Sequence, residues 1–305
     1  MIKKAKDPGF GYNSTENVKE IIDKDGNSNI VHHNRKFSVD DLYTFFIDLS
    51  WWHFFILVIL GYTFLNICFG LLYTVIGIEQ ITPSKGDFFK DFLNGFFFSA
   101  QTLTTVGYGG IVPKGILANI IASFEAMIGL LSFSFITGLL YGRFSKAKAA
   151  IRFSDHVIVR DFKKEKALMF RLMNSRKSIM IEPEATVTLS INKVDELGNY
   201  KRSFFELQLE REKITYLPTL WTIVHEINKE SPFYGLSNEE MISLDANLYV
   251  LIQYHEESYA QKVYQATTYN CSELIFNKKF KSSTTFNEDG YTILDHEKLN
   301  DVEAL

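Results

Sequence analysis

Cysteine is scarce in this chain of 305 residues, which contains only Cys68 and Cys271. Cys68 lies in an apolar run and Cys271 lies far along the chain in a polar region. We therefore expect no disulfide framework and a reducing compartment for the soluble part. The seven histidines are scattered without the spacing of a metal site. No nucleophile is arranged with a general base, so the sequence predicts a protein that is not an enzyme and has no cofactor.

A large positive charge is also missing. The net charge is −4, which is too acidic overall for a nucleic-acid binder, so no nucleic-acid partner is expected. The chain has no GxGxxG motif, and a nucleotide-binding regulatory domain is not predicted. The polar N-terminus lacks an apolar core flanked by a cleavage site, so we expect no signal peptide.

Two long apolar runs occupy the first half of the chain, at about 51–76 and 116–142, and only Glu125 interrupts the second. A helix over the first run is about 39 Å long, enough to cross a bilayer with some tilt. One such run also fits a buried core helix. Two runs, the first of which opens with Trp51-Trp52, favour membrane spans.

The basic residues predict the orientation of these spans. Lysine and arginine cluster before the first run and just after the second, whereas the connecting segment holds only Lys85, Lys90 and Lys114. Basic residues accumulate on the cytoplasmic side of a membrane protein. We therefore expect a multi-pass protein of the plasma (inner) membrane, with both termini in the cytoplasm.

The segments around the spans suggest further elements. Residues 1–37 are polar and rich in turn residues, which predicts a flexible cytoplasmic tail. Residues 38–50 have an apolar face at helical spacing and predict an interfacial helix, or alternatively the first turns of the next helix. A shorter apolar stretch at about 92–103 fits a re-entrant helix, with Asp91 or Asp87 near its N-terminus. The pore helix and its loop are expected at about 91–110, within a pore domain at 51–145.

The loop after the re-entrant stretch reads Thr105-Val106-Gly107-Tyr108-Gly109, a sequence of potassium-selective filters. The carbonyls of the first four residues, with the Thr105 hydroxyl, replace the hydration shell of a K⁺ ion if all point to one axis. This requires alternating backbone handedness, and Gly107 and Gly109 enter positive φ without steric cost. A chance glycine turn is the alternative. One loop supplies a quarter of a ring, so the sequence predicts a homotetramer.

The second half of the chain has a different pattern. After an expected linker at 146–153, short alternating segments separated by turn residues fill 154–305. Such a pattern predicts an all-β sandwich or barrel. The expected fold class is an α-helical two-span membrane pore domain with a re-entrant pore helix, followed by an all-β cytoplasmic domain.

Several segments together make the chain similar to the inward-rectifier potassium channels, specifically their prokaryotic branch. Besides the filter, they are Phe96–Leu103, Thr137–Ser145, Trp221–His225 and Ser231–Gly235. The resemblance implies that 38–50 is a slide helix, that the β-domain is an immunoglobulin-like sandwich extending the pore, and that anionic lipids control the channel.

The chain departs from the family at three points. Gly110 stands where many relatives have Asp just after the filter, which bears on the stability of the outer mouth. The cysteines that form a disulfide beside the pore in animal relatives are absent. Strongly rectifying relatives have an acid partway down the second span, where alignment places Phe133. We therefore expect weak polyamine block at this position, and block of the filter by Ba²⁺.

Three residues of the second span, Phe133, Thr137 and Tyr141, fall on one helical stripe. Such a stripe more often packs than acts, but the family resemblance gives Phe133 and Tyr141 pore-facing positions, and we interpret them as the gate. Glu125 is an acid inside a span, and we expect it to support the filter rather than bind ions. A position high enough to reach outer water is the alternative.

Basic residues crowd the end of the second span and approach it from the N-terminal side. Clusters of this kind predict a binding site for anionic lipid or phosphoinositide. Its members are Arg35, Lys36, Arg143, Lys146, Lys148 and Arg152.

The sequence thus predicts a passive, gated, potassium-selective channel of inward-rectifier type, regulated by its β-domain and by anionic lipids. One alternative is a membrane-anchored ligand sensor with incidental conduction, against which the intact filter argues. A non-selective cation channel is another alternative, against which Tyr108 argues.

Overall fold

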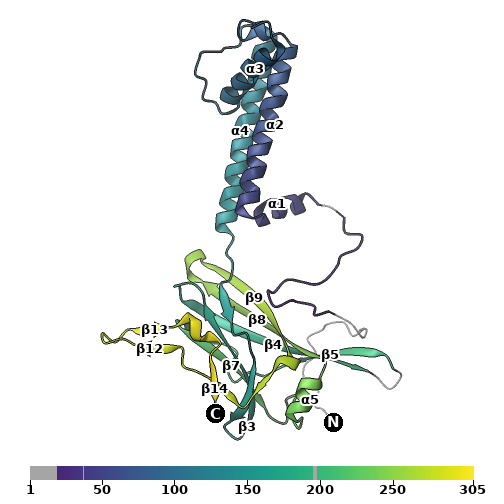
Figure 1. Ribbon diagram of the computed structural model, residues 1–305, viewed down its shortest axis with the longest axis vertical. Helices are drawn as coiled ribbons and strands as arrows, with labels where there is room; N and C mark the ends of the chain where they lie inside the picture. Colours follow the sequence, from purple (N-terminus) through teal and green to yellow (C-terminus); the bar gives the residue numbers. More distant parts are fainter. Residues whose placement is uncertain (1–18, 37, 195–197) are drawn as a thin grey trace. The chain divides into compact units, whose positions relative to one another are not determined.

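The computed structural model describes residues 19–36, 38–194 and 198–305, and its chain divides into two compact units. The helical unit comprises Asn34–Lys146, and the β-unit comprises Ala147–Leu305 together with the described residues up to His33. Each unit is described by itself. Figure 1 shows the helices of the first unit and the strands of the second.

The helical unit contains the two predicted spans. Its elements are α1 (Val39–Asp48), α2 (Trp51–Val75), η1 (Ile78–Gln80), α3 (Phe88–Leu103) and α4 (Ile116–Ser145). Only α2 and α4, among the described helices, are long and apolar enough to cross a membrane, and most of their surface is not buried within the chain.

Helix α1 is a separate helix rather than the beginning of α2. It ends at Asp48, and Ser50 then adopts an extended conformation as the N-cap of α2, where its hydroxyl accepts from the His53 backbone N–H. The extended φ and ψ of an N-cap break the path of the preceding helix. The alternative that 38–50 forms the first turns of the span is therefore wrong.

Helix α3 begins at Phe88, about one turn earlier than the apolar pattern suggested. Asp87 is its N-cap and accepts from the Phe89 N–H at 3.2 Å. Asp91 is buried and accepts from the Ser84 hydroxyl at 2.5 Å and the Lys85 N–H at 2.8 Å. The apolar run underestimates the helix because polar capping, rather than hydrophobicity, determines where it starts.

Glycines let α3 approach both spans closely. A Cβ on Gly95 would lie 2.7 Å from the Gly70 carbonyl oxygen of α2, and a Cβ on Gly129 of α4 would lie 2.1 Å from the Leu103 carbonyl oxygen. By contrast, a Cβ on Gly138 would have no neighbour within 4 Å. The contacts at Gly129 indicate that its role is close helix packing.

In its described residues, the β-unit has fourteen strands and the short helix α5 (Asn238–Ser243). The strands are β1 (Ile151–Phe153), β2 (Ile158–Phe162), β3 (Glu165–Asn174), β4 (Met180–Val194), β5 (Tyr200–Glu206), β6 (Tyr216–Leu217), β7 (Leu220–Ile227), β8 (Ala246–Glu256), β9 (Gln261–Asn270), β10 (Ile275–Phe276), β11 (Lys278–Phe280), β12 (Thr284–Phe286), β13 (Thr292–Leu294) and β14 (Val302–Ala304).

Two five-stranded sheets form a sandwich, which confirms the predicted fold class. One has the order β1-β3-β2-β10 with β7 also on β3, and the other has the order β5-β4-β8-β9 with β6 also on β4. Alternate residues of both sheets, such as Phe170 and Leu189, share one buried core. Strands β12 and β13 pair as a hairpin that projects from the sandwich (Figure 1).

The expected linker at 146–153 is too long. Strand β1 already pairs with β3 from Ile151, and α4 ends at Ser145, so five residues separate the helix from the strand. The pattern misses β1 because three residues are too few to show alternation. Strand β1 is recognised from its pairing with β3 instead.

The expected flexible tail is wrong for residues 19–29, whereas 1–18 and 37 lie outside the described residues. Asp23 accepts from the Asn27 N–H at 2.8 Å, and Gly26 has φ +83°. The Thr267 and Thr268 hydroxyls of β9 donate to carbonyls of this turn at 2.9 and 2.8 Å. Polar composition suggested flexibility, but the sheet satisfies the polar groups of the turn.

His225 joins the two sequence segments 221–225 and 231–235 of the β-unit. Its buried ring donates from Nδ1 to the Gln208 carbonyl at 2.7 Å and accepts at Nε2 from the Ser231 hydroxyl at 2.8 Å. Burial lowers the pKa of His225, although the Gln208 carbonyl and the Glu226 charge oppose this shift. The neutral imidazole is therefore the form that fits the fold.

We expect His225 to make the β-unit less stable in acid. The unfolded chain binds a proton near pH 6.5 whereas the folded chain resists it, so stability falls as pH drops below that value. The slope contributed by one group is at most about 1.4 kcal/mol per pH unit. Unfolding midpoints between pH 7.5 and 5 should fall less steeply in His225→Gln than in the wild type. The exposed His255→Gln is the control, and equal slopes in all three proteins would contradict the assignment.

Candidate ion-conducting pore

The filter loop is anchored to the end of the pore helix. The Val106 and Gly107 N–H groups donate to the Gln101 carbonyl at 2.9 and 3.3 Å, and the Tyr108 N–H donates to Gln101 Oε1 at 3.2 Å. Gln101 thus holds three successive residues of the loop against the C-terminus of α3. The sequence analysis did not assign this role to Gln101, because a glutamine near a helix end has many uses.

Backbone handedness alternates along the loop. Thr105, Gly107 and Gly109 have φ values of +59°, +53° and +81°, whereas Val106 and Tyr108 are not among the residues with positive φ. The two glycines adopt the conformation that the sequence predicts. The positive φ of Thr105 was not expected, since a non-glycine residue rarely adopts it without support from its surroundings.

The side chains of the filter have few partners within their own chain. Tyr108 is 85% exposed and Val106 is 53% exposed. Both side chains are therefore largely uncovered within their own chain.

Glu125 lies in a fully buried polar cluster behind the pore helix. Its carboxyl accepts from the Tyr73 hydroxyl of α2 at 2.7 Å and lies against the Ser99 hydroxyl of α3, which also contacts Asn66 Oδ1 at 3.0 Å. Glu125 belongs to α4, so the cluster joins all three helices. The alternative that Glu125 reaches outer water is not compatible with this burial.

The expected gate residues lie on an open face of α4. Phe133 is 71% exposed and Tyr141 is 75% exposed within the chain, and Thr137 between them is also exposed. An apolar groove of about 820 Å³ between α2 and α4 extends from Thr105 down to Phe46 and includes Phe133. The face of α4 that carries Phe133 and Tyr141 is thus not packed by its own chain.

The structure separates the basic residues of the expected lipid site. Arg143 donates to the carbonyls of Phe46, Ile47 and Leu49 at 2.6, 2.9 and 2.6 Å, and its guanidinium lies over the Trp51 ring at 4.5 Å. These are carbonyls at the end of α1, which a helix leaves without internal partners. Arg143 therefore caps α1 from α4, a role that the sequence analysis missed.

The other basic residues have different surroundings. Lys146 pairs with Asp48, and Arg35 pairs with Asp41 of α1. Lys36 is exposed in the helical unit, whereas Lys148 and Arg152 are exposed in the β-unit. The structure thus brings Arg35, Lys146 and the α1 cap together on the helical unit, and it leaves Lys148 and Arg152 on the segment that leads into the sandwich.

Known proteins resemble the chain along both units. Residues 151–305 match the family described as the inward rectifier potassium channel C-terminal domain, and residues 52–146 match the family described as ion channel. The chain is 32% identical to the inward rectifier potassium channel Kirbac3.1 of Paramagnetospirillum magnetotacticum, over 92% of this chain and 95% of that protein.

More distant relatives come from animals. The chain is 24% identical to the human G protein-activated inward rectifier potassium channel 2, over 93% of this chain and 72% of that protein. It is 26% identical to the ATP-sensitive inward rectifier potassium channel 12 of Gallus gallus, over 80% and 61% of the two chains. These are ion channels rather than enzymes. The chain belongs to the inward rectifier potassium channel family and is similar to its prokaryotic branch.

Proposed function

We propose that this protein is a potassium-selective channel whose filter is formed by Thr105–Gly109 from four identical chains. The observation that carries the proposal is the alternation of positive φ at Thr105, Gly107 and Gly109, in a loop that Gln101 holds at the end of a re-entrant helix. Alternation turns successive carbonyls toward one side, where they replace the hydration shell of K⁺. The negative pole of α3 adds to the attraction for a cation.

The tetramer follows from the same geometry. One filter strand surrounds no ion by itself, and ring closure by identical copies gives a symmetric assembly. The exposed Tyr108 and the apolar groove beneath the filter are the surfaces that neighbouring subunits would cover. We place the assembly in the plasma (inner) membrane with both termini in the cytoplasm, as the distribution of lysine and arginine favours.

Flux through liposomes containing the purified protein tests this function. Potassium and rubidium should pass, sodium should pass poorly, and Ba²⁺ should block from solution because its size is close to that of K⁺ but its charge is higher. The mass of the detergent-solubilised protein should be that of four chains. Comparable sodium and potassium fluxes, or a dimer that conducts, would contradict the proposal.

Anionic lipid is the proposed regulator, and the contacts of Arg143 change which residues should bind it. Arg143 uses its guanidinium to cap α1, so the basic side chains without such a task are Lys36, Lys148 and Arg152. Each basic residue near an anionic surface contributes about 1 kcal/mol of attraction. The lipid contact should therefore depend chiefly on the segment between α4 and the sandwich.

We expect Lys148→Gln with Arg152→Gln to weaken the response of rubidium flux to phosphoinositide. Loss of two contacts should shift the lipid concentration for half-maximal response by about 30-fold. The matched control is Lys164→Gln with Lys229→Gln, two exposed lysines at the opposite end of β3 from β1. Equal lipid titrations for the two double variants would remove this segment from the lipid site.

A further inference from the structure

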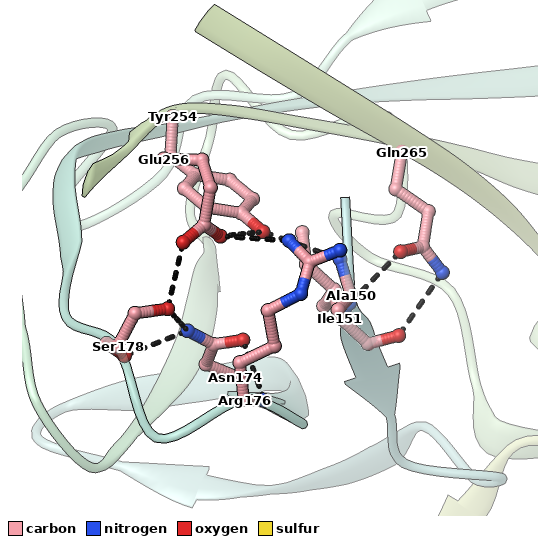
Figure 2. Close-up of polar contacts among 8 residues, drawn as sticks. All are labelled: Ala150, Ile151, Asn174, Arg176, Ser178, Tyr254, Glu256 and Gln265. Atoms are coloured by element: carbon pink, nitrogen blue, oxygen red, sulfur yellow. Dashed lines mark hydrogen bonds and ion pairs between the residues drawn. The ribbon is translucent and has the colours of Figure 1, made fainter. Parts of the chain in front are cut away.

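At the entrance to the sandwich, all the backbone polar groups of Ala150 and Ile151 are hydrogen-bonded, three of the four to side chains. The Ala150 N–H donates to the Tyr254 hydroxyl at 3.2 Å, and the Ala150 carbonyl accepts from the Ser175 N–H at 2.7 Å. The Ile151 N–H donates to Gln265 Oε1 at 2.9 Å, and its carbonyl accepts from Gln265 Nε2 at 3.0 Å. Figure 2 shows the Tyr254 and Gln265 contacts with this strand.

A buried carboxylate determines how the Tyr254 hydroxyl is oriented. Glu256 is fully buried and accepts from the Tyr254 hydroxyl at 3.2 Å, from the Ser178 hydroxyl at 2.7 Å and from Arg176 at 3.1 Å. An ionised carboxylate only accepts, so the single hydroxyl proton of Tyr254 is directed at Glu256. The oxygen lone pair is then left for the Ala150 N–H.

The ion pair between Glu256 and Arg176, which helps to fix this orientation, is not an efficient way to stabilise a domain. Burying an ion pair costs desolvation that its attraction barely offsets, and an apolar replacement is often equally stable. The hydrogen bonds from Ser178 and Arg176 outweigh burial and lower the pKa of Glu256, so the carboxylate stays charged. Its charge is available to orient Tyr254 throughout the neutral range.

We propose that Tyr254, Gln265 and Glu256 form a latch that fixes the start of β1 to strands β8 and β9, and that this latch influences gating through the short segment that joins β1 to α4. Tyr254 and Gln265 hold Ala150 and Ile151 directly, and Glu256 is a positioning residue that acts through Tyr254. Only five residues separate α4 from β1, so the covalent link is at most about 20 Å long when extended. The latched strand is therefore tied to the end of α4 by a short covalent segment. This inference rests on the proposed function, since it concerns how the channel is gated.

The latch is tested on the full-length channel by hydrogen exchange and by rubidium flux. In Tyr254→Phe and in Gln265→Leu, exchange of the peptide covering residues 147–151 should accelerate. Resting rubidium flux should change by about threefold or more, in the range of ordinary coupling between sites. The control is Tyr249→Phe on the same strand β8, because its hydroxyl accepts from the Ile21 N–H and does not touch the linker.

Glu256→Gln separates positioning from a merely structural role. If Glu256 acts through Tyr254, the flux change of Glu256→Gln should disappear in the Tyr254→Phe background, whereas independent losses of stability would add. Faster exchange with unchanged flux, or equal behaviour of Tyr254→Phe and Tyr249→Phe, would overturn the latch. If the wild type passes no potassium, the proposed function fails, while the exchange result still decides whether the strand is held.

Discussion

Gly107→Ala should abolish selective potassium flux while leaving the helices intact. Gly107 has φ +53°, and a Cβ there would meet no atom of its own chain within 4 Å, so the penalty is backbone strain rather than a clash. A left-handed conformation costs an L-residue roughly 1–2 kcal/mol, which is about 4–8 kcal/mol for four copies in one ring. The loop relieves this strain by leaving the alternating conformation, and the carbonyls then no longer surround the ion.

The control for this variant is Gly138→Ala. Gly138 lies inside α4, where a Cβ would also meet nothing within 4 Å and where alanine is the better helix former. Both proteins should elute as tetramers, and only Gly107→Ala should lose its preference for potassium over sodium in liposomes. If Gly107→Ala keeps the wild-type ratio of potassium to sodium flux, the loop does not need a residue that easily adopts the left-handed conformation at this position.

Tyr141→Ala should raise resting potassium flux without changing selectivity. Tyr141 is 75% exposed and lies two turns nearer the end of α4 than Phe133. We expect the α4 helices of a tetramer to converge there and to bring these side chains closest together. Four aromatic rings close a pore by excluding water, and smaller side chains let water return. A shift of about 1.4 kcal/mol toward the open state gives a tenfold higher flux when the open state is rare.

The control for the gate is Phe135→Ala, which removes a ring of the same size at nearly the depth of Phe133. Residue 135 lies about 200° around the helix from residue 133, so it points away from the stripe. Its ring instead contacts Phe46 of α1 at 6.2 Å. If Phe133→Ala raises flux and Tyr141→Ala does not, the gate lies higher in the pore. If neither variant changes flux, the filter becomes the leading constriction.

The same stripe predicts a gain of rectification. Phe133→Asp places an acid at the level where the wild type has an apolar ring, and four such acids attract a polycation. Spermine applied from the cytoplasmic side should then block strongly, whereas it blocks the wild type weakly there. The selectivity for potassium should be unchanged, because the filter is not altered.

The parts of this fold that could be predicted are those in which a short stretch of sequence carries the whole signal. The spans at 51–75 and 116–145 are visible in the sequence as apolar runs. The filter is a local motif, and its two glycines are needed for one reason, which is their positive φ. The parts that could not be predicted need a partner from elsewhere in the chain. Gln101 and Arg143 act on backbone groups that are left unpaired by a loop and by a helix end.

Polar composition gave a wrong expectation where contacts with distant parts of the chain satisfy the polar groups of a segment. The turn at 23–27 is as polar as a disordered tail, but hydroxyls of β9 bind its carbonyls. Glu256 follows Tyr254-His255 and precedes Glu257 in a segment that reads as a solvated strand end, yet it is fully buried. Nothing in the local pattern distinguishes Glu256 from Glu257, because the difference comes from Arg176 and Ser178 in a distant turn.

The Arg143 cap has a mechanical consequence. The carbonyls of Phe46, Ile47 and Leu49 and the ring of Trp51 hold one side chain of α4, so the end of α1 is fastened to the end of α4. The sequence predicts that α1 lies at the membrane surface, so turning α4 about its axis should move α1 along that surface, since several charge-assisted bonds join the two helices. We therefore expect bilayer thickness and lateral pressure to act on α4 through α1, even when no lipid headgroup is bound.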